Sequence, residues 1–331
     1  MNEFGYRGRR VSYSDDDYVI VLLGDSQLET CGLPDDQMPE ILLEKGLGAL
    51  GKKTRVIALG ASGYGQDQQL LALEEYFQKY RADLVVVWLT PANDIWNNTF
   101  RTHTVSRTDG PPKPTFWLEN HVLKGPTERI GERTSSLYLL QLLRNAFGGF
   151  EAAWSRRLPP VDKGMAAIPP ELAATTATTQ EAIEIQHSHW SMFLTPTPPR
   201  VQYGIELTRA LLTRIQDTAA RHGARFATMI EDRTTTTAQA AWTGGANPYI
   251  EPPQPKAVEH ERRYWIADLE AYIKNISETT NGFPFFLVPI TIIDHHKEGD
   301  AHLNVAGNTQ IMTDFAARLV ESGFVDRQTG G

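Results

Sequence analysis

The stretch Tyr18-Val-Ile-Val-Leu-Leu-Gly-Asp-Ser-Gln-Leu-Glu29 decides the fold. Its first part, Val19–Leu23, is a short run of β-branched and other apolar residues, which is typical of a strand buried on both faces of a parallel sheet. The run stops at Gly24, where glycine allows a sharp turn. Open α/β sheets bind ligands at the carboxyl ends of their strands, so Ser26 lies where a ligand would bind. Gly-Asp-Ser alone is equally consistent with an ordinary turn that carries a solvated Asp and Ser.

Two more short apolar runs repeat this pattern. Residues 55–59 end at a glycine-rich turn that contains Gly63, and residues 83–89 end at Thr90-Pro-Ala-Asn-Asp94. Alternating strands and helices predict a doubly wound α/β unit with parallel strands, so all three polar turns should lie along one edge of the sheet. The helices predicted between the runs span residues 39–50 and 66–80.

The alternating pattern lapses between residues 97 and 202 and then resumes. Residues 96–133 lack a regular period and are expected to form loops, a helix is predicted at 135–157, and the rest of the region is rich in Pro, Thr and Ala. Such a segment is either an insertion that lies over the sheet edge or a surface loop without a role. We therefore divide the chain into residues 1–96, an insertion at 97–202, and residues 203–325. The later elements are helices at 203–222, 259–276 and 305–322 and strands within 224–230 and 283–293.

Composition restricts the class of protein. The 331 residues are 41% hydrophobic, which suffices for a large core, and the net charge of −8 gives no support for nucleic-acid binding. No run approaches the ~20 apolar residues of a membrane span, and the polar N-terminus lacks the apolar region of a signal peptide. We therefore expect a cytoplasmic protein, or a secreted or membrane-anchored one if an N-terminal segment has been removed. The single cysteine, Cys31, excludes an intrachain disulfide and a multi-cysteine zinc site, and we expect it to be a small buried filler.

Three side chains with the chemistry of a catalytic triad follow predicted strands. Ser26, Asp300 and His302 each lie just past a strand, so a parallel sheet would bring their loops to one edge. A serine hydroxyl becomes a good nucleophile when an imidazole accepts its proton, and an acid fixes the tautomer of that imidazole. The backbone N–H groups of Ser26 and Gly63 and the side-chain amide of Asn93 are candidate donors to the oxyanion that acyl transfer generates.

Each of the neighbouring polar residues has a plainer interpretation. Asp25 is expected to hydrogen-bond within its own turn. Asn93 could simply form a turn, and His302 could be an exposed residue at the start of a helix. Tyr64 and Gln66–Gln69 either line the site or begin the next helix.

Four blocks of the chain resemble those of SGNH (GDSL-type) hydrolases. The first, second, third and fifth blocks of that family are matched by Gly24-Asp-Ser26, Leu59-Gly-Ala-Ser-Gly-Tyr-Gly65, Pro91-Ala-Asn-Asp94 and Asp300-Ala-His-Leu-Asn304. The resemblance extends from residue 18 to about residue 320, with the blocks in the family's order. It implies a flavodoxin-like sheet of five parallel strands ordered 2-1-3-4-5, and serine-dependent cleavage of esters. Carried over residue by residue, it makes Ser26 the nucleophile, Gly63 and Asn93 oxyanion donors, His302 the base and Asp300 its acid.

The chain departs from the family pattern in two places. Pro91 stands where the family usually has glycine, which could alter the backbone of the oxyanion hole. The acid Asp300 lies two residues before His302 instead of three. Some branches of the family use this shorter spacing, while Asp294 and Glu298 remain alternative acids.

A metal site is an alternative use of the same region. Three histidines and two aspartates lie close together in the sequence, but their spacing fits no standard ligand pattern, and ester cleavage of this type needs neither a metal nor a cofactor. The residues are Asp294, His295, His296, Asp300 and His302.

We interpret the chain as a serine esterase that releases a short acyl group, such as acetyl, from a carbohydrate or small-molecule ester. Tryptophans in predicted loops can stack on sugar rings, although they more often anchor a loop by burying apolar area. The alternatives are an acyltransferase on the same fold, which passes the acyl group to a sugar hydroxyl, and a non-catalytic carbohydrate-binding protein. The sequence leaves the oligomeric state open. The tryptophans are Trp96, Trp117, Trp190 and Trp242.

Overall fold

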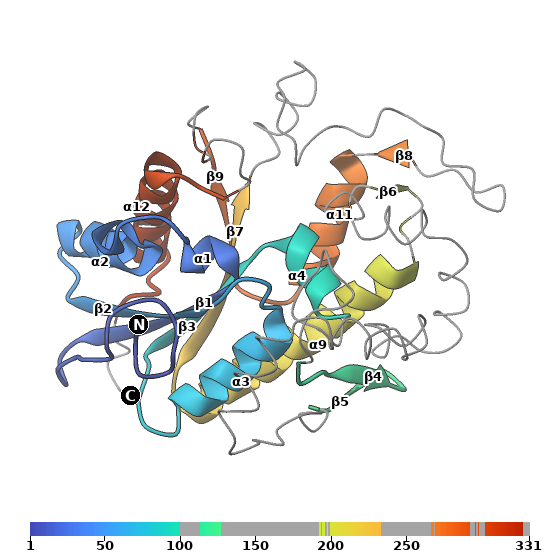
Figure 1. The fold of residues 1–331 in the computed structure, drawn as a ribbon, viewed down its shortest axis with the longest axis horizontal. Coiled ribbons are helices and arrows are strands. Elements are labelled where there is room, and N and C mark those ends of the chain that lie inside the picture. Colours follow the sequence, from blue (N-terminus) through green and yellow to red (C-terminus); the bar gives the residue numbers. More distant parts are fainter. Residues whose placement is uncertain are drawn as a thin grey trace, which may run out of the picture.

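A five-stranded parallel sheet forms the centre of the chain in a computed structural model (Figure 1). The spatial order β2-β1-β3-β7-β9 is the 2-1-3-4-5 order of the five strands along the chain, so the predicted fold class is confirmed. The strands are β1 (Tyr18–Gly24), β2 (Thr54–Gly60), β3 (Leu84–Leu89), β7 (Arg225–Asp232) and β9 (Phe285–Pro289). The structure describes residues 1–99, 113–126, 192, 194–195, 197, 199–232, 266–267, 269–291, 295, 297 and 302–326.

Helices cover both faces of the sheet, as Figure 1 shows. Residues of β1 alternate between two apolar clusters: Val19, Val21 and Leu23 pack with α3 and α9, whereas Ile20 and Leu22 pack with α2 and α12. This alternation explains why the strand is apolar at every position. The main helices are α2 (Pro39–Ala49), α3 (Gln66–Tyr76), α9 (Pro199–Arg221), α11 (Leu269–Thr280) and α12 (Val305–Glu321).

Short elements depart from the sequence-based expectation. Residues 113–126, expected to be loop, contain an antiparallel hairpin whose turn residues, Asn120 and His121, have φ of 50° and 62°. Strands of three residues are too short to produce a detectable period, which is why this hairpin was not predicted. The helix predicted at 135–157 lies outside the described residues. The short elements are α1 (Ser26–Glu29), the 3₁₀ helix η1 (Asp35–Gln37), α4 (Pro91–Asn97), β4 (Trp117–Glu119), β5 (Val122–Lys124), β6 (Leu194–Thr195) and β8 (Ile266–Ala267).

The segment that precedes β1 is anchored to the end of α1. Arg7 donates hydrogen bonds to the carbonyl oxygen of Thr30 at 2.6 Å and to the carboxylate of Asp35 at 3.0 Å. The side-chain amide of Asn2 donates to the carbonyl of Ala58, in β2, at 3.2 Å. The bond to Thr30 satisfies a carbonyl group at the end of the short helix α1, and the bond to Ala58 ties the same N-terminal segment to the sheet, so the segment helps to hold α1 in place.

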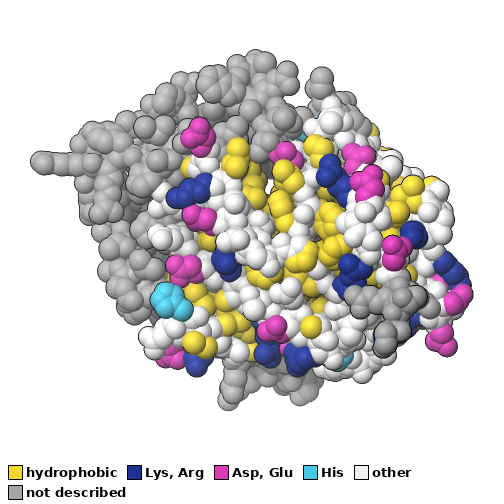
Figure 2. All heavy atoms as spheres, turned by 180° about the vertical axis from the view of Figure 1, so that it is seen from behind, with side chains coloured by type: hydrophobic (Ala, Val, Ile, Leu, Met, Phe, Trp, Pro, Cys, Tyr) yellow, Lys and Arg dark blue, Asp and Glu magenta, His cyan; other side chains and the backbone are white. Residues whose placement is uncertain are grey.

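The surface mixes charged and apolar side chains. Figure 2 shows the face opposite to Figure 1, where hydrophobic side chains form a band among charged side chains of both signs. Phe285 and Leu287, on the edge strand β9, are among the large apolar residues that remain exposed. Within the part of the chain that the structure describes, no helix is both long and apolar enough to cross a membrane.

Candidate active site

Ser26 is the first residue of α1, and Asp25 alone separates it from the end of β1. A Cβ atom on Gly24 would lie 2.9 Å from Cβ of Leu28, and one on Gly60, at the end of β2, would lie 2.7 Å from the carbonyl oxygen of Gly24. Glycine is therefore needed at both strand ends because α1 and, at Gly60, the end of β1 pack so closely there, and not only because the chain turns. This packing fixes the backbone of Ser26 at the edge of the sheet.

Three of the N–H groups at the start of α1 donate to Asp25, the residue before Ser26. The N–H of Gln27 donates to the side chain of Asp25, while those of Leu28 and Glu29 donate to its carbonyl oxygen. The N–H of Ser26 has no acceptor among the described residues, as is usual for the first turn of a helix. It can therefore donate to a ligand.

Asp25 is buried and accepts hydrogen bonds from two separate segments. The N–H of Gln27 (2.8 Å) and the hydroxyl of Thr90 (3.3 Å) donate to Oδ1, and the amide of Asn93 (2.7 Å) donates to Oδ2. Burial raises the pKa of the Asp25 carboxyl, and these donors together with the charge of His302 oppose that shift. The predicted bond within its own turn is confirmed. The bonds to Thr90 and Asn93 were not predicted, and they connect the end of β3 to the turn that carries Ser26.

Asn93 lies in the first turn of α4, so the polar turn expected after the third strand is in fact the start of a helix. The N–H groups of Asn93 and Asp94 both donate to the carbonyl of Thr90 at 2.8 Å. Pro91 is the first helical residue, a position that needs no N–H donor. The amide nitrogen of Asn93 carries two hydrogens, so one remains for a ligand while the other binds Asp25.

The turn between β2 and α3 contains Gly63, whose φ of 76° is in the region that favours glycine. The preceding residue, Ser62, donates through its N–H (2.7 Å) and its hydroxyl (2.6 Å) to the carboxylate of Glu29. Glu29 is the last residue of α1, so this turn is tied to the helix that Ser26 begins. The N–H of Gly63 has no acceptor within the described part of the chain.

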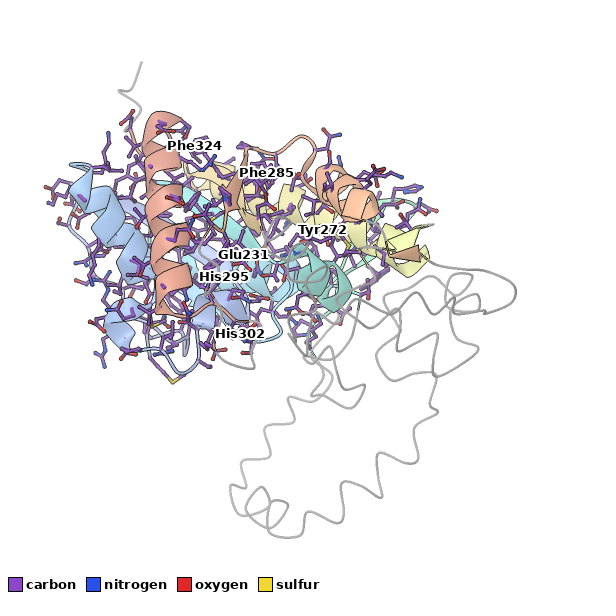
Figure 3. The ribbon with its side chains drawn as sticks, turned by 90° about the horizontal axis from the view of Figure 1, so that it is seen from above. Glu231, Tyr272, Phe285, His295, His302 and Phe324 are labelled. Atoms are coloured by element: carbon purple, nitrogen blue, oxygen red, sulfur yellow. The ribbon has the colours of Figure 1, made fainter. Side chains whose placement is uncertain are left out.

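His302 lies just before α12, at the end of that helix opposite to Phe324 (Figure 3). The N–H of Leu303 donates to the side-chain oxygen of Gln27 at 3.3 Å, across 276 positions of sequence. The imidazole of His302 is also near enough that, when protonated, it lowers the pKa of the Asp25 carboxyl. The structure therefore brings the loop of His302 to the turn that carries Ser26, although two strands separate β1 from β9 in the sheet.

The segment that precedes His302 is described only at isolated positions. His295 is buried, and its carbonyl oxygen accepts a hydrogen bond from the N–H of Asn304 at 2.8 Å. The role of Asp300 as the acid therefore stays a prediction. No group of His, Cys, Asp and Glu side chains suited to a metal ion occurs among the described residues. The predicted residues that lie outside them are Asp294, His296, Glu298 and Asp300.

A group of buried polar side chains lies beneath the turns of Gly63 and Asn93; we call it the buried polar layer. The amide of Gln66 donates to Asp94 at 2.8 Å, and the amide of Asn98 donates to Gln66 at 2.6 Å and to Thr208 at 2.8 Å. Gln66–Gln69 were predicted either to line the site or to begin a helix; they begin α3 and are buried. The layer consists of Gln66, Asp67, Asp94, Asn98, Lys113 and Thr208.

Asp94 is the member of this layer nearest to the candidate oxyanion donor. Burial raises the pKa of its carboxyl well above the usual range, and the negative charge of Asp25 raises it further. Hydrogen bonds from the N–H of Thr90 and the amide of Gln66 oppose the shift. We therefore expect Asp94 to keep its proton to a higher pH than an exposed aspartate would.

The prediction for Cys31 is wrong, because its side chain is exposed. The residue follows Thr30, which ends α1 with a left-handed φ of 44°, and Cys31 lies in the loop after that helix. Of the four tryptophans singled out in the sequence, Trp117 is half-buried in β4. Trp190 and Trp242 lie outside the described residues.

Comparisons with known proteins give distant similarities. A scan against protein-family models finds no match, and a search of curated protein sequences also finds none. Among solved structures, the chain is similar to the psychrotrophic esterase EstA from Pseudoalteromonas sp., with 10% identity, a TM-score of 0.41 and coverage of 93% of this chain and 100% of the other. It is also similar to TesA, with 14% identity, a TM-score of 0.40 and coverage of 91% and 97%. Such low identity leaves the chemistry of the site to be judged from this chain's own residues.

Proposed function

We propose that the chain is a serine esterase that removes a short acyl group, such as acetyl, from a carbohydrate or other small-molecule ester. One observation carries the proposal: the loops of two candidate catalytic side chains both bind the turn of Ser26. Asn93 donates to Asp25 at 2.7 Å, and the residue after His302 donates to Gln27 at 3.3 Å. Ser26, Asn93 and His302 follow three different strands of one parallel sheet, and the carboxyl ends of parallel strands share one edge, which supports these roles.

In the proposed reaction, the hydroxyl oxygen of Ser26 attacks the ester carbonyl and His302 accepts the hydroxyl proton. The resulting oxyanion binds the N–H groups of Ser26 and Gly63 and the amide of Asn93. Collapse of the intermediate breaks the bond to the alcohol, which leaves with the proton from His302. Water then cleaves the acyl-enzyme by the same steps, and the acid and Ser26 are released. By the family resemblance, Asp300 would orient the imidazole.

The substitution Ser26→Ala tests the nucleophile. We expect the turnover of p-nitrophenyl acetate to fall about 10⁴-fold or more, because removing a nucleophile removes the covalent route. Circular dichroism should show that the variant still folds. Ser322→Ala is the matched control, since its hydroxyl lies exposed at the far end of α12, bonded to the carbonyl of Arg318. Turnover retained by Ser26→Ala would reject the assignment.

Two further measurements separate the alternatives. A fluorophosphonate should label the wild-type chain at Ser26, whereas a non-catalytic carbohydrate-binding protein would stay unlabelled. Product analysis with a sugar acceptor present distinguishes the esterase from an acyltransferase. Free acetate as the main product supports the esterase, and an acetylated sugar supports the transferase.

A further inference from the structure

Lys113 is a lysine whose side chain has no exposed surface. Its ammonium group donates to a carboxylate oxygen of Asp67 at 2.5 Å and to the carbonyl oxygen of Asn97 at 2.7 Å. A buried ammonium costs free energy unless it is paired and hydrogen-bonded, so a lysine at such a place needs both partners. Burial lowers the pKa of Lys113 and raises that of Asp67, and the attraction between the two charges opposes both shifts.

The two partners of Lys113 belong to two different helices. Asp67 is the second residue of α3, which begins just after the turn of Gly63. Asn97 is the last residue of α4, which carries Asn93 in its first turn. The ammonium therefore binds the start of one helix and the end of the other. A cation at the end of α4 is also favoured by the dipole of that helix.

The same two helices meet at Asn98, which follows α4. Its side-chain oxygen accepts a hydrogen bond from the N–H of Asp67 at 3.4 Å, and its amide donates to Gln66 at 2.6 Å. Gly65, which precedes α3, packs so closely on the amide of Asn98 that a Cβ atom would not fit there. These contacts join the start of α3 to the end of α4. Among the described members of the buried polar layer, Lys113 supplies the only positive charge.

We propose that Lys113 is a positioning residue for the oxyanion hole: by binding α3 and α4 at once, it holds the N–H of Gly63 and the amide of Asn93 at the spacing that the transition state needs. The inference rests on the proposed function, because it takes both groups as oxyanion donors. Such donors act because they are held in place before the reaction, so a small displacement lowers kcat more than it weakens substrate binding. Lys113 touches no reacting atom in this scheme and acts through the two helices.

The substitution Lys113→Met keeps an unbranched side chain that is one atom shorter and removes the charge. We expect kcat for p-nitrophenyl acetate to fall by about tenfold to a hundredfold while KM changes by less than about threefold. Hydrogen–deuterium exchange should increase in the peptides that cover residues 60–66 and 90–98. Phe315→Ala is the matched control for lost stability, because it opens a cavity on the other face of the sheet; its kcat and its exchange in these two peptides should match wild type.

A second variant keeps the test informative if Lys113→Met does not fold. The double change Lys113→Met with Asp67→Asn leaves no unpaired buried charge, so it should regain stability but keep the low kcat, because the bridge between α3 and α4 is still missing. A folded variant with kcat within twofold of wild type, an equal fall in Phe315→Ala, or unchanged exchange in both peptides would overturn the proposal.

Ser26→Ala is measured beside these variants to separate the two proposals. If wild type and Ser26→Ala do not differ, the esterase function fails, and the exchange of the two peptides alone decides whether Lys113 holds the turns. If wild type turns over substrate and the Lys113 variants do so equally well, the esterase function stands and the role of Lys113 fails.

Discussion

The two faces of the sheet bury acidic side chains in different ways. On the side of α3 and α4, Asp25, Asp67 and Asp94 each accept hydrogen bonds from named donors. On the side of α2 and α12, Glu40 is 1% exposed, and its side-chain oxygens have no hydrogen-bond partner among the described residues. Buried acids with donors can orient other groups, whereas a buried acid without donors only costs stability. The buried acids on the side of α3 and α4 thus support the candidate site, whereas Glu40, on the side of α2 and α12, supports no other group among the described residues.

The largest effect on stability is expected on the face of the sheet that α2 and α12 cover. Phe315 has no exposed surface and packs against Phe286, with ring centroids 5.5 Å apart. Phe315→Ala should lower the free energy of unfolding by about 3–5 kcal/mol, because a large buried ring is replaced by a cavity. Urea unfolding measures the loss. A loss below about 1.5 kcal/mol would mean that the neighbouring side chains move to fill the cavity and that this face is less tightly packed than the structure indicates.

Glu40 sharpens the comparison through pH. Burial raises the pKa of its carboxyl to about 7, against the opposing charges of Arg9 and Arg7. The folded chain therefore holds a proton that the unfolded chain releases near pH 4.5. The contribution of Glu40 to the free energy of unfolding falls as pH rises from about 4.5 to about 7 and is constant at higher pH. Glu40→Gln should raise the free energy of unfolding by about 3 kcal/mol at pH 8, because a tenfold change in proton affinity corresponds to about 1.4 kcal/mol. Near pH 4 the same substitution should leave the free energy of unfolding unchanged.

The matched control for this variant is Glu321→Gln, an exposed glutamate at the end of α12. It should change stability by less than about 0.5 kcal/mol at either pH. Equal stability of Glu40→Gln and wild type at pH 8 would show that Glu40 has partners in solution, and the contrast between the two faces would then disappear.

The smallest change tests the packing of the face that supports the site. Gly204, in α9, lies so close to α4 that a Cβ atom would be 2.7 Å from the carbonyl oxygen of Ile95. Gly204→Ala should therefore lower the free energy of unfolding by about 1–3 kcal/mol and reduce kcat, because α4 carries Asn93. Helix propensity alone predicts the opposite sign, a gain of about 1 kcal/mol. Thermal unfolding distinguishes the two, with the exposed Asp217→Ala in the same helix as control.

Local sequence patterns predicted the sheet and the place of Ser26. The strands of a doubly wound sheet are apolar at every position, so the runs before Gly24 and Gly60 were recognisable without knowledge of their partners. The common direction of parallel strands then placed the turns of Ser26, Gly63 and Asn93 at one edge. Whether Asp300 orients His302 stays a prediction, since the acid lies outside the described residues.

The tertiary structure alone decided what supports the site. The pairs Lys113 with Asp67 and Leu303 with Gln27 are 46 and 276 positions apart, and no local period connects them. A single polar side chain in a sequence predicts an exposed residue, because the burial of a polar group costs free energy unless the group has a hydrogen-bond partner. Only the fold supplies those partners. The sequence by itself therefore determined where Ser26, the proposed nucleophile, lies, and the tertiary structure decided which buried charges lie beneath the turns around it.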